Sequence, residues 1–354
     1  MAKGKDIQNL KHFLSLVRMG MWGRAEDLQP EGTDWEKITR WARQQTVIPI
    51  VAEGMEVSGL AGQIKESCIA DLFESSASNA RIHHLLDNAA AKAYTLLEEE
   101  DIPSVLIKGQ GIARSYRNPL LRQCGDVDLL VGSRNYEKIP QTLSKHGYTI
   151  ARQGGKHTDF YVSDFRVEIH RVCVETSSSV MNSFFLSWGD RQVKDSSKSF
   201  SPAGSEVMVR IPEDEFNAIY VFVHMFSALV SNGTGLRQLC DLAAVLSSGG
   251  KTLNREIILK SLTSHKLLRA WQVFGCVLVD YLGLPVEDFP FYDETQLPKA
   301  ERLMDLIIES GNFGFFLKRP QGRQSVWSTA GYLWRKFVWK TSMVKLFPES
   351  LTKI

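Results

Sequence analysis

The chain has 354 residues, a length that favours two or three domains. Hydrophobic residues make up 44% of the chain and charged residues 23%, which is typical of a soluble globular protein with a substantial core. The formal net charge is only +2, which argues against a bulk electrostatic attraction to nucleic acid.

The first hundred residues are predicted to form helices. Residues 5–20 and 33–55 carry apolar side chains at helical spacing, and a long helix is predicted from about residue 61 to residue 100, with at most one break. His83 and His84 lie within this long helix. We expect both at the surface, because no cysteine or further histidine at ligand spacing accompanies them.

A small sheet is predicted next. Residues 104–107 form a short apolar run that predicts a strand, and a short helix is expected to follow it. Asn118-Pro119 indicates a turn, after which "DVDLLV" at residues 126–131 predicts another strand. A helix is expected near residues 136–146. Three strand-like runs follow, "YTIAR" (148–152), "HTDFYVS" (157–163) and "FRVEIHRVC" (165–173), and "SEVMVRIP" (205–212) adds an edge strand or a linker.

The chain is predicted to be helical again from Pro212. Residues 213–230 and 234–248 are the clearest helices, and residues 255–283 are expected to form two more. The most apolar stretch, residues 270–285, is short and contains two polar residues, so we interpret it as a buried helix. The expected fold is α+β in three parts: a helical region of residues 1–100, a small mixed sheet with its helices in residues 101–211, and a helical region of residues 212–354.

The five cysteines predict neither disulfides nor a structural zinc site. Their number is odd, their spacing is wide, and no C-x-x-C motif occurs. This usage fits a reducing cytoplasm, and no signal-peptide pattern is seen near the N-terminus. Cys124 lies close to two aspartates and is interpreted as a small buried side chain.

Asp126 and Asp128 stand at the head of the "DVDLLV" run. Residues i and i+2 of a strand project to the same face, so the two carboxylates point together while Val127 and Leu129 point into the core. Carboxylates at such range repel each other, and a divalent cation removes this cost. The pair is therefore predicted to bind Mg²⁺ or Mn²⁺ together with substrate phosphates. The alternative for Asp126 is a turn residue after Gly125.

The run "FRVEIH" offers a third carboxylate. Its alternation places Val167 and Ile169 on one face and Glu168 and His170 on the other. If this strand lies beside the aspartate strand, Glu168 completes a cluster that can hold two metal ions for a phosphoryl displacement. A merely exposed position for Glu168 is the alternative.

These motifs resemble the nucleotidyltransferases of the DNA polymerase β-like superfamily and, more narrowly, a poorly characterised bacterial nucleotidyltransferase family. The family pattern is a strand ending in Lys-Gly, a turn with Pro and Arg, Asp-hydrophobic-Asp-Leu-Leu-Val, and a strand of the Glu-Leu-His type. The resemblance covers roughly residues 102–246, and the matching positions are Lys108, Gly109, Pro119, Arg122, Asp126, Asp128, Glu168, Ile169 and His170.

The resemblance implies transfer of a nucleoside monophosphate from an NTP to an acceptor hydroxyl, with release of pyrophosphate. Asp126, Asp128 and Glu168 would bind the metal, and Glu168 would help to deprotonate the acceptor. The residues expected at the nucleotide are Lys108, Gly109, Gln110, Gly111 and Arg122.

The chemistry of these residue types agrees with such roles. Glycines at a strand-to-helix turn let backbone N–H groups approach phosphates, and Lys108 and Arg122 would neutralise triphosphate charge unless they are ordinary solvated cations. The chain departs from the wider superfamily at Gln110, where Gly or Ser is usual. His170 is expected to orient a carboxylate or to contact the acceptor, and the alternative is a histidine that is simply hydrogen-bonded nearby. The acceptor, whether a protein, a small molecule, a sugar or RNA, has no identifying motif in the helical flanks.

Other readings of these motifs are weaker. A dinucleotide fold would need a third glycine where "GQGIAR" has Arg114, and no P-loop motif occurs. A metal-dependent glycosyltransferase also uses D-x-D, but it would need a long α/β region before the motif, where this chain is predicted helical. A non-catalytic nucleotide-binding or regulatory protein on the same scaffold is the main alternative, and the presence of all three acids argues against it.

The sequence leaves the roles of two groups of residues in the C-terminal region undecided. His224, Arg237 and Asp241 could line the cleft, although Arg237 and Asp241 at i, i+4 also fit a surface ion pair and His224 also fits a core histidine. Residues 317–354 form a basic segment with one acid, Glu349. This segment fits a basic amphipathic helix for acidic partners or a membrane surface, or, as we favour, a helix packed on the body with a solvated basic face. Its basic and tryptophan residues are Lys318, Arg319, Arg323, Arg335, Lys336, Lys340, Lys345, Lys353, Trp327, Trp334 and Trp339.

Overall fold

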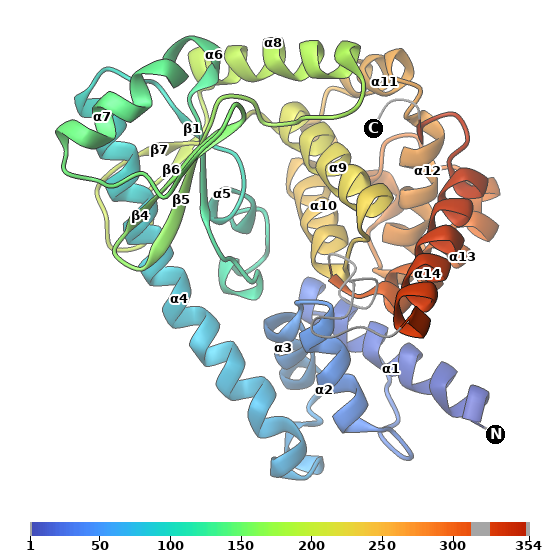
Figure 1. The fold of residues 1–354 in the computed structure, drawn as a ribbon. Helices are drawn as coiled ribbons and strands as arrows, with labels where there is room; N and C mark the ends of the chain where they lie inside the picture. The colour runs from blue at the N-terminus through green and yellow to red at the C-terminus, as the bar shows by residue number, and fades with distance from the viewer. Residues whose placement is uncertain (1, 313–325, 352–354) are drawn as a thin grey trace.

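The structure is a computed structural model, and it describes residues 2–312 and 326–351 (Figure 1). It is an α+β fold in which a small mixed sheet is flanked by N-terminal and C-terminal helices, as the sequence predicts. The chain opens with three helices, α1 (Ala2–Trp22), α2 (Trp35–Gln44) and α3 (Ile48–Ser58). α1 and α3 cross closely at two glycines, because a Cβ on Gly20 would lie 1.9 Å from the Ile50 carbonyl oxygen and one on Gly54 2.1 Å from that of Leu16.

The long helix α4 (Glu66–Glu99) connects the N-terminal helices to the sheet. It is unbroken over 34 residues and follows a short 3-10 turn at Ala61–Gln63. Its beginning packs against α2 and α3, and its second half lies along one face of the sheet (Figure 1). Leu86, Ala90, Tyr94 and Leu97 of this half are buried in one cluster with side chains of the strands.

The sheet contains five short strands in the order β1-β2-β5-β4-β3. β2 and β5 are parallel, and the other neighbours are antiparallel. The predicted strand over residues 148–152 is wrong except at its end. Tyr148 instead packs its ring on Phe160, with centroids 5.1 Å apart, and the Ala151 N–H donates to the Asp159 carbonyl oxygen at 2.8 Å just before β3 begins. The strands are β1 (Val105–Leu106), β2 (Val127–Leu130), β3 (Arg152–Gln153), β4 (His157–Val162) and β5 (Phe165–His170).

Shorter elements complete this region. The expected helix near residues 136–146 is present as a 3-10 turn at Tyr136–Lys138 followed by α7. The 17-residue helix α8 falls where no helix was predicted, and the predicted edge strand near residue 209 pairs only with β6 in a two-stranded ribbon. The elements are α5 (Gln110–Ala113), α6 (Gly132–Asn135), α7 (Ile139–Lys145), α8 (Ser179–Asp195), β6 (Ser199–Phe200) and β7 (Val209–Arg210).

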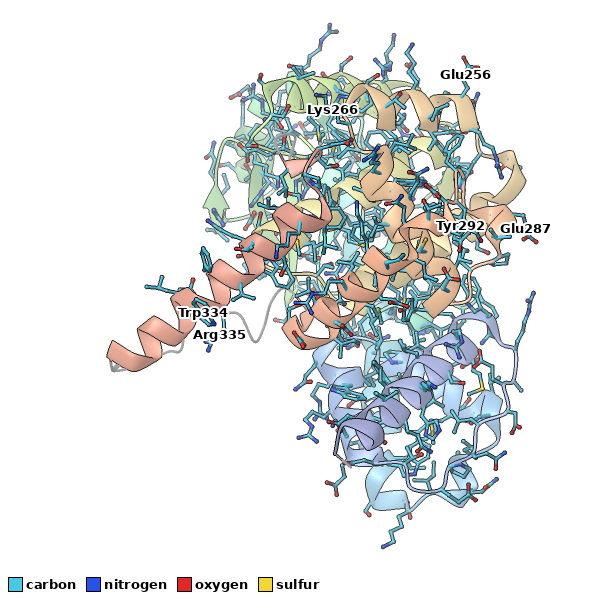
Figure 2. The ribbon with its side chains drawn as sticks, turned by 90° about the vertical axis from the view of Figure 1, so that its right-hand side faces the viewer. Glu256, Lys266, Glu287, Tyr292, Trp334 and Arg335 are labelled. Carbon is cyan, nitrogen blue, oxygen red and sulfur yellow. The ribbon has the colours of Figure 1, made fainter. Side chains whose placement is uncertain are left out.

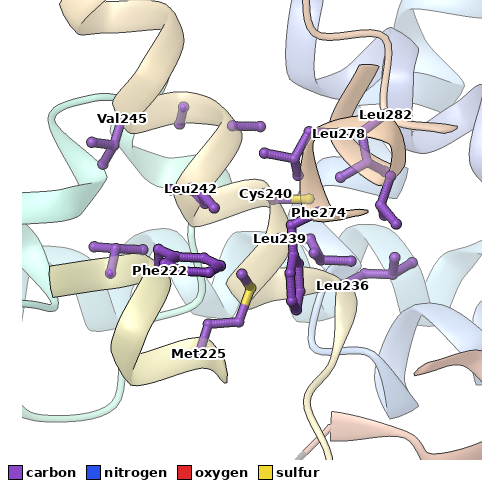
Figure 3. Packing of buried hydrophobic residues seen from close by; sticks show 14 of the residues in the cluster. Phe222, Met225, Leu236, Leu239, Cys240, Leu242, Val245, Phe274, Leu278 and Leu282 are labelled. Atoms are coloured by element: carbon purple, nitrogen blue, oxygen red, sulfur yellow. The ribbon is translucent and has the colours of Figure 1, made fainter. Parts of the chain in front are cut away.

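The C-terminal helices pack around a large apolar core. Phe222, Leu239, Phe274 and Leu278 lie within it (Figure 3), and the same core includes side chains from the N-terminal helices and from β1. The apolar stretch at residues 270–285 divides between α12 and a π-helical turn at Val277–Tyr281, and no helix among the described residues could cross a membrane. The helices are α9 (Asp214–Ser231), α10 (Leu236–Gly249), α11 (Arg255–Ser264), α12 (Leu268–Cys276), α13 (Leu297–Ser310) and α14 (Val326–Leu346).

α14 is the basic helix of the C-terminal segment. Trp339 and Met343 are buried against the body, and the Trp339 indole Nε1–H donates to the Leu229 carbonyl oxygen at 3.1 Å, which agrees with the packed helix that the sequence favoured. Figure 2 shows that its N-terminal part extends away from the neighbouring helices, with Trp334 and Arg335 on this extension. Lys318, Arg319, Arg323 and Lys353 lie outside the described residues, as do the side chains of Trp327 and Cys68.

Candidate functional site

The strand register places the acidic residues together. β2 and β5 run in parallel, and Asp128 is the partner of Glu168 in their register. Val127 and Leu129 are buried toward α4, so the alternating residues of both strands face away from that helix. Asp126, immediately before β2, lines the same cavity as Asp128 and Glu168. The condition that the sequence left open, that the two strands be neighbours, is therefore met.

Gly109 lies in the loop after β1, beside this cluster. Its φ is +50°, a conformation that favours glycine, and a Cβ would lie 2.9 Å from the Asp126 carbonyl oxygen. The loop can therefore pass close to the aspartates only without a side chain. The preceding Lys108 directs its ammonium into the cluster, where Nζ donates to Asp128 Oδ1 at 3.0 Å.

A cavity of about 460 Å³ opens over these residues. One wall comes from the sheet and the β1–α5 and β2 loops, and the other from α9 and α10. This size and mixed polar and apolar lining suit a small-molecule or nucleotide ligand. The lining residues are Lys108, Gly109, Ile112, Arg122, Gly125, Asp126, Asp128, Lys156, His157, Glu168, His170, Tyr220, Val221, His224, Met225, Arg237, Gln238 and Asp241.

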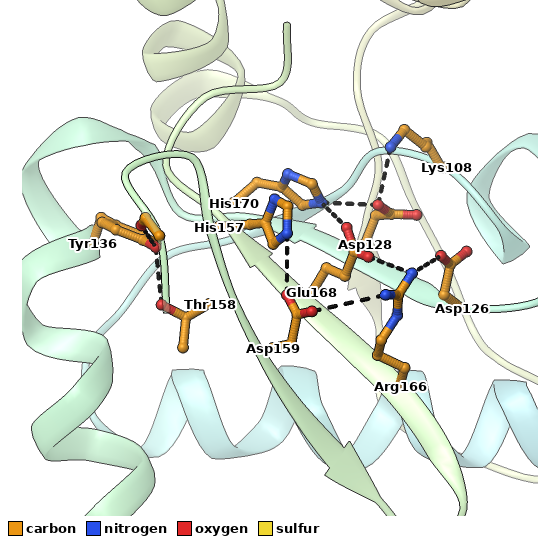
Figure 4. A network of polar contacts seen from close by, with 11 residues as sticks. Lys108, Asp126, Asp128, Tyr136, His157, Thr158, Asp159, Arg166, Glu168 and His170 are labelled. Carbon is orange, nitrogen blue, oxygen red and sulfur yellow. Dashed lines mark hydrogen bonds and ion pairs between the residues drawn. The ribbon is translucent and has the colours of Figure 1, made fainter. Parts of the chain in front are cut away.

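The carboxylates are partly neutralised by cations of the chain itself. Arg166, two residues before Glu168 on β5, lies across the outer side of the cluster (Figure 4). Its Nη2 is 2.6 Å from Glu168 Oε1 and 3.3 Å from Asp126 Oδ2, and its Nη1 is 3.7 Å from Asp159 Oδ2. Arg166 was not identified from the sequence, although the alternation of the strand places it on the same face as Glu168.

Two histidines complete the inner side of the cluster. The buried His170 has its Nε2 2.8 Å from Asp128 Oδ1 and 3.3 Å from Glu168 Oε2, so one imidazole contacts both carboxylates. His157 lies on the neighbouring strand, with its ring centroid 5.3 Å from that of His170. His157, Glu168 and His170 bring possible ligand atoms within 4.8 Å of one another and could also hold a metal ion. Neither His157 nor the acid Asp159, its partner at 3.2 Å, was singled out in the sequence.

The electrostatic environment distinguishes the three acids. Burial raises the pKa of Asp128, but Lys108 and the contact with His170 outweigh it and hold that pKa well below its usual range. The His170 contact, against the effect of burial, also lowers the pKa of Glu168. Burial and the charge of Asp128 raise the pKa of Asp126. Near pH 7 Asp128 and Glu168 are therefore ionised, and at Asp126 the repulsion by Asp128 is only partly offset by Lys108 and Arg166.

Arg122 is not a solvated cation. It is 4% exposed, and its Nε and Nη2 donate to the two oxygens of Asp241 on α10 at 2.8 and 3.0 Å. Tyr116 Oη donates to the same carboxylate at 2.7 Å. The suggested surface ion pair between Arg237 and Asp241 is therefore wrong, since Asp241 is buried and bound to Arg122. Arg122 lines the cavity, but its positive charge is already paired with the Asp241 carboxylate.

Gln110 and Gly111, which the resemblance places at the nucleotide, are not among the residues that line the cavity. The Gln110 side chain is buried on the α4 side, where Nε2 donates to Asp87 Oδ1 at 2.7 Å. A Cβ on Gly111 would lie 2.9 Å from the Leu106 carbonyl oxygen, so this glycine serves packing. The prediction that His83 is exposed is also wrong: it is 2% exposed, and its Nε2 donates to the Arg122 carbonyl oxygen at 2.6 Å.

The helical wall adds residues with different chemistry. His224 lines the cavity, and burial together with the charge of Lys108 lowers its pKa well below 6.5, so its imidazole is neutral near pH 7. Arg237 Nη1 donates to the Gln123 carbonyl oxygen at 3.1 Å. Tyr220 on α9 and Lys156, just before β4, also line the cavity and carried no recognisable signal in the sequence.

Comparison with known families agrees with this geometry. A family model described as an uncharacterised nucleotidyltransferase matches residues 31–283, which is more than half of the chain and includes every residue that lines the cavity. Comparisons with curated proteins and with solved structures found no match. The match contains the strands that carry Asp126, Asp128 and Glu168, and it ends before α13 and α14. The chain therefore belongs to the uncharacterised nucleotidyltransferase family.

Proposed function

We propose that the chain transfers a nucleoside monophosphate from an NTP to an acceptor hydroxyl, with a divalent metal ion held by Asp126, Asp128 and Glu168. One observation carries this proposal: Asp128 and Glu168 are register partners on parallel strands, and they line one cavity together with Asp126 and Gly109. Membership of the family supports nucleotidyl transfer in general. The metal, the nucleotide and the acceptor are the parts that we add.

The donor set fits Mg²⁺ or Mn²⁺. Carboxylate oxygens are the ligands that these hard cations prefer. Asp128 Oδ2 is buried and has no hydrogen-bond partner among the described residues, so one oxygen of the central carboxylate is available. A cation would also relieve the repulsion that raises the pKa of Asp126. When bound, such an ion neutralises charge on the phosphates and increases the acidity of the acceptor hydroxyl.

The residues of the chain supply the rest of the reaction. Burial lowers the pKa of Lys108, but Asp128, Tyr220 and Asp126 together raise it by more, so the ammonium keeps its positive charge and can pair with the phosphates. The oxygen of the acceptor hydroxyl forms a bond to the α-phosphorus, and the Glu168 carboxylate accepts the proton that this hydroxyl loses. The bond from that phosphorus to the bridging oxygen breaks, and pyrophosphate leaves with the electron pair. Positioning and charge neutralisation supply most of the catalysis in such reactions.

The acceptor would enter along α9 and α10. Tyr220, Val221 and Met225 give this wall an apolar part, and His224 adds a neutral imidazole. A hydroxyl on a protein, a small molecule, a sugar or RNA could meet these groups. Incubation with each labelled NTP, Mg²⁺ or Mn²⁺, and cell extract, followed by identification of the labelled species, tests the proposal directly.

Glu168→Gln separates an enzyme from a nucleotide-binding scaffold. The substitution keeps the shape of the side chain and removes the base that accepts the acceptor proton. We expect nucleotide affinity to stay within about tenfold of wild type, roughly 1.4 kcal/mol, while transfer falls by at least about a hundredfold. Calorimetric binding and label transfer are measured on the same preparation.

The matched control is Glu137→Gln. Glu137 is an acid in the 3-10 turn between α6 and α7, and its substitution should leave nucleotide affinity and label transfer unchanged. Undiminished transfer by Glu168→Gln would remove Glu168 from the mechanism. If the wild type binds NTPs but transfers nothing to any acceptor in the extract, the scaffold function is favoured instead.

Arg166→Gln tests whether this arginine competes with the metal. Its guanidinium bridges Glu168 and Asp126, so a cation that binds both acids must displace it. Removing one positive charge at this half-exposed position should strengthen binding of Mn²⁺ alone by about three- to tenfold. The loss of the free Mn²⁺ signal in electron paramagnetic resonance measures this affinity. Arg171→Gln, at an exposed position just after β5, should leave it unchanged, and weaker binding by Arg166→Gln would contradict the competition.

A further inference from the structure

α14 has two apolar faces, and only one of them is packed. Trp339, Met343 and Leu346 point into the body, where the following Phe347 packs its ring on Phe226 with centroids 4.9 Å apart. Other residues of the helix are apolar and exposed as well, and two of them, Trp334 and Val338, line a pocket shared with Leu306 and Glu309 of α13. Trp334 and Phe337 are 65% and 61% exposed, and Leu333, Val338 and Val344 are also exposed. A helix that only covers a core would carry polar residues on this outer face.

The exposed apolar residues of α14, which we call the outer stripe, are clustered rather than scattered over the surface. Leu333, Trp334, Phe337, Val338 and Val344 recur at helical spacing within twelve positions, and they are five of the thirteen large hydrophobic side chains exposed among the described residues. Single exposed apolar residues need no explanation, whereas a contiguous apolar patch indicates an interaction surface. Figure 2 shows Trp334 on the part of α14 that extends from the body.

The charge of the helix restricts its partner. Residues 326–346 contain four basic side chains, Arg335, Lys336, Lys340 and Lys345, and no acid. A second copy of this helix on the stripe would bring these four cations against the same four, a like-charge contact that opposes association. An anionic partner would instead be attracted by each of them.

We infer that α14 lies on an anionic lipid surface, with the outer stripe among the acyl chains and with Lys340 and Lys345 at the headgroups. Large aromatic side chains next to Lys and Arg on one exposed helix are typical of interfacial anchoring. A protein groove would need acidic rims around an apolar floor, whereas a convex, extended helix meets a flat surface without such a partner. The inference is independent of the function proposed for the cavity.

Vesicle co-sedimentation of the full chain tests this inference. Vesicles of neutral phosphatidylcholine are compared with vesicles that contain about 30% phosphatidylglycerol, at low salt and at about 0.5 M salt. We expect binding to the anionic vesicles only, weakened at high salt. Trp334→Ser with Phe337→Ser should reduce that binding at least about tenfold, and Lys340→Gln with Lys345→Gln by about tenfold.

Two control variants change exposed residues on helices other than α14. Leu85→Ser on α4 and Lys260→Gln on α11 remove an exposed apolar and an exposed basic residue elsewhere and should bind like wild type. Unchanged Tm in all variants shows that they remain folded. Equal binding to neutral vesicles, no binding to either, or undiminished binding by the double serine variant would overturn the inference. Light scattering that finds a dimer lost in the same variant would assign the stripe to a second copy instead.

Discussion

Asp128→Asn is expected to reduce label transfer by at least about 10³-fold, equivalent to about 4 kcal/mol of transition-state stabilisation. Asp128 is the centre of the cluster: its Oδ1 contacts Lys108 and His170, and its Oδ2 is the buried oxygen that has no partner. Asparagine keeps the size of the side chain but replaces a charged ligand oxygen with an amide. The measurement is kcat/KM for label transfer once an acceptor is identified, together with Mn²⁺ binding in its absence.

Asp164→Asn is the matched control. Asp164 is exposed in the turn between β4 and β5, on the same sheet but outside the cavity, and its substitution should change neither transfer nor Mn²⁺ binding. Comparable Tm values for both variants would show that the fold is retained. Transfer by Asp128→Asn at even a tenth of the wild-type rate would exclude a metal site centred on this residue.

Arg122→Met is expected to lower the free energy of unfolding by about 3–5 kcal/mol, the usual cost of leaving one partner of a buried ion pair alone. Asp241 would lose both hydrogen bonds from Arg122 and keep the one from Tyr116, and its charge would be buried without its ion-pair partner. Chemical denaturation measures the loss. Arg122→Met combined with Asp241→Leu should recover most of it, because neither charge of the ion pair is left without its partner.

A surface ion pair provides the comparison. Arg269 and Glu349 are 3.1 Å apart with side chains that are 65% and 51% exposed, and Arg269→Met should cost no more than about 1 kcal/mol. If Arg122→Met is destabilised no more than Arg269→Met, the pair with Asp241 does not hold the fold together. If the double variant is as unstable as the single one, the loss comes from packing and not from charge.

The sequence predicts well those features that depend on local pattern. The period-two alternation placed Asp126 and Asp128 on one face and Glu168 with His170 on another strand, and the strand register then brings Asp128 beside Glu168. The helices at residues 213–230 and 234–248 follow from apolar periodicity and agree with α9 and α10 within a few residues. By contrast, α8 carries a weak apolar pattern, and Ser178, which caps it by accepting from the Met181 N–H at 3.3 Å, was its only local signal.

Long-range partners could not be predicted. Arg122 and Asp241 are 119 residues apart, and no local pattern tells a cation that binds phosphate from one already paired in the interior. The sequence predicted His83 to be a surface residue, yet its side chain is buried and donates a hydrogen bond to the Arg122 carbonyl oxygen in the loop before β2. Arg166 could have been found, because its place two residues before Glu168 fixes its face. Such errors arise where tertiary contacts override the local pattern.

The Arg122–Asp241 pair limits how the chain can be recombined. Arg122 belongs to the sheet region and Asp241 to α10, and Gln45 links the N-terminal helices to α10 and α13 through the Leu236 N–H at 3.0 Å and the Ile307 carbonyl oxygen at 3.2 Å. A chimera that replaced residues 101–211 with a segment lacking this arginine would leave the Asp241 carboxylate without its partner. The sheet that carries the acids is therefore not a transferable module, and grafting it would require the matching face of α10 to travel with it.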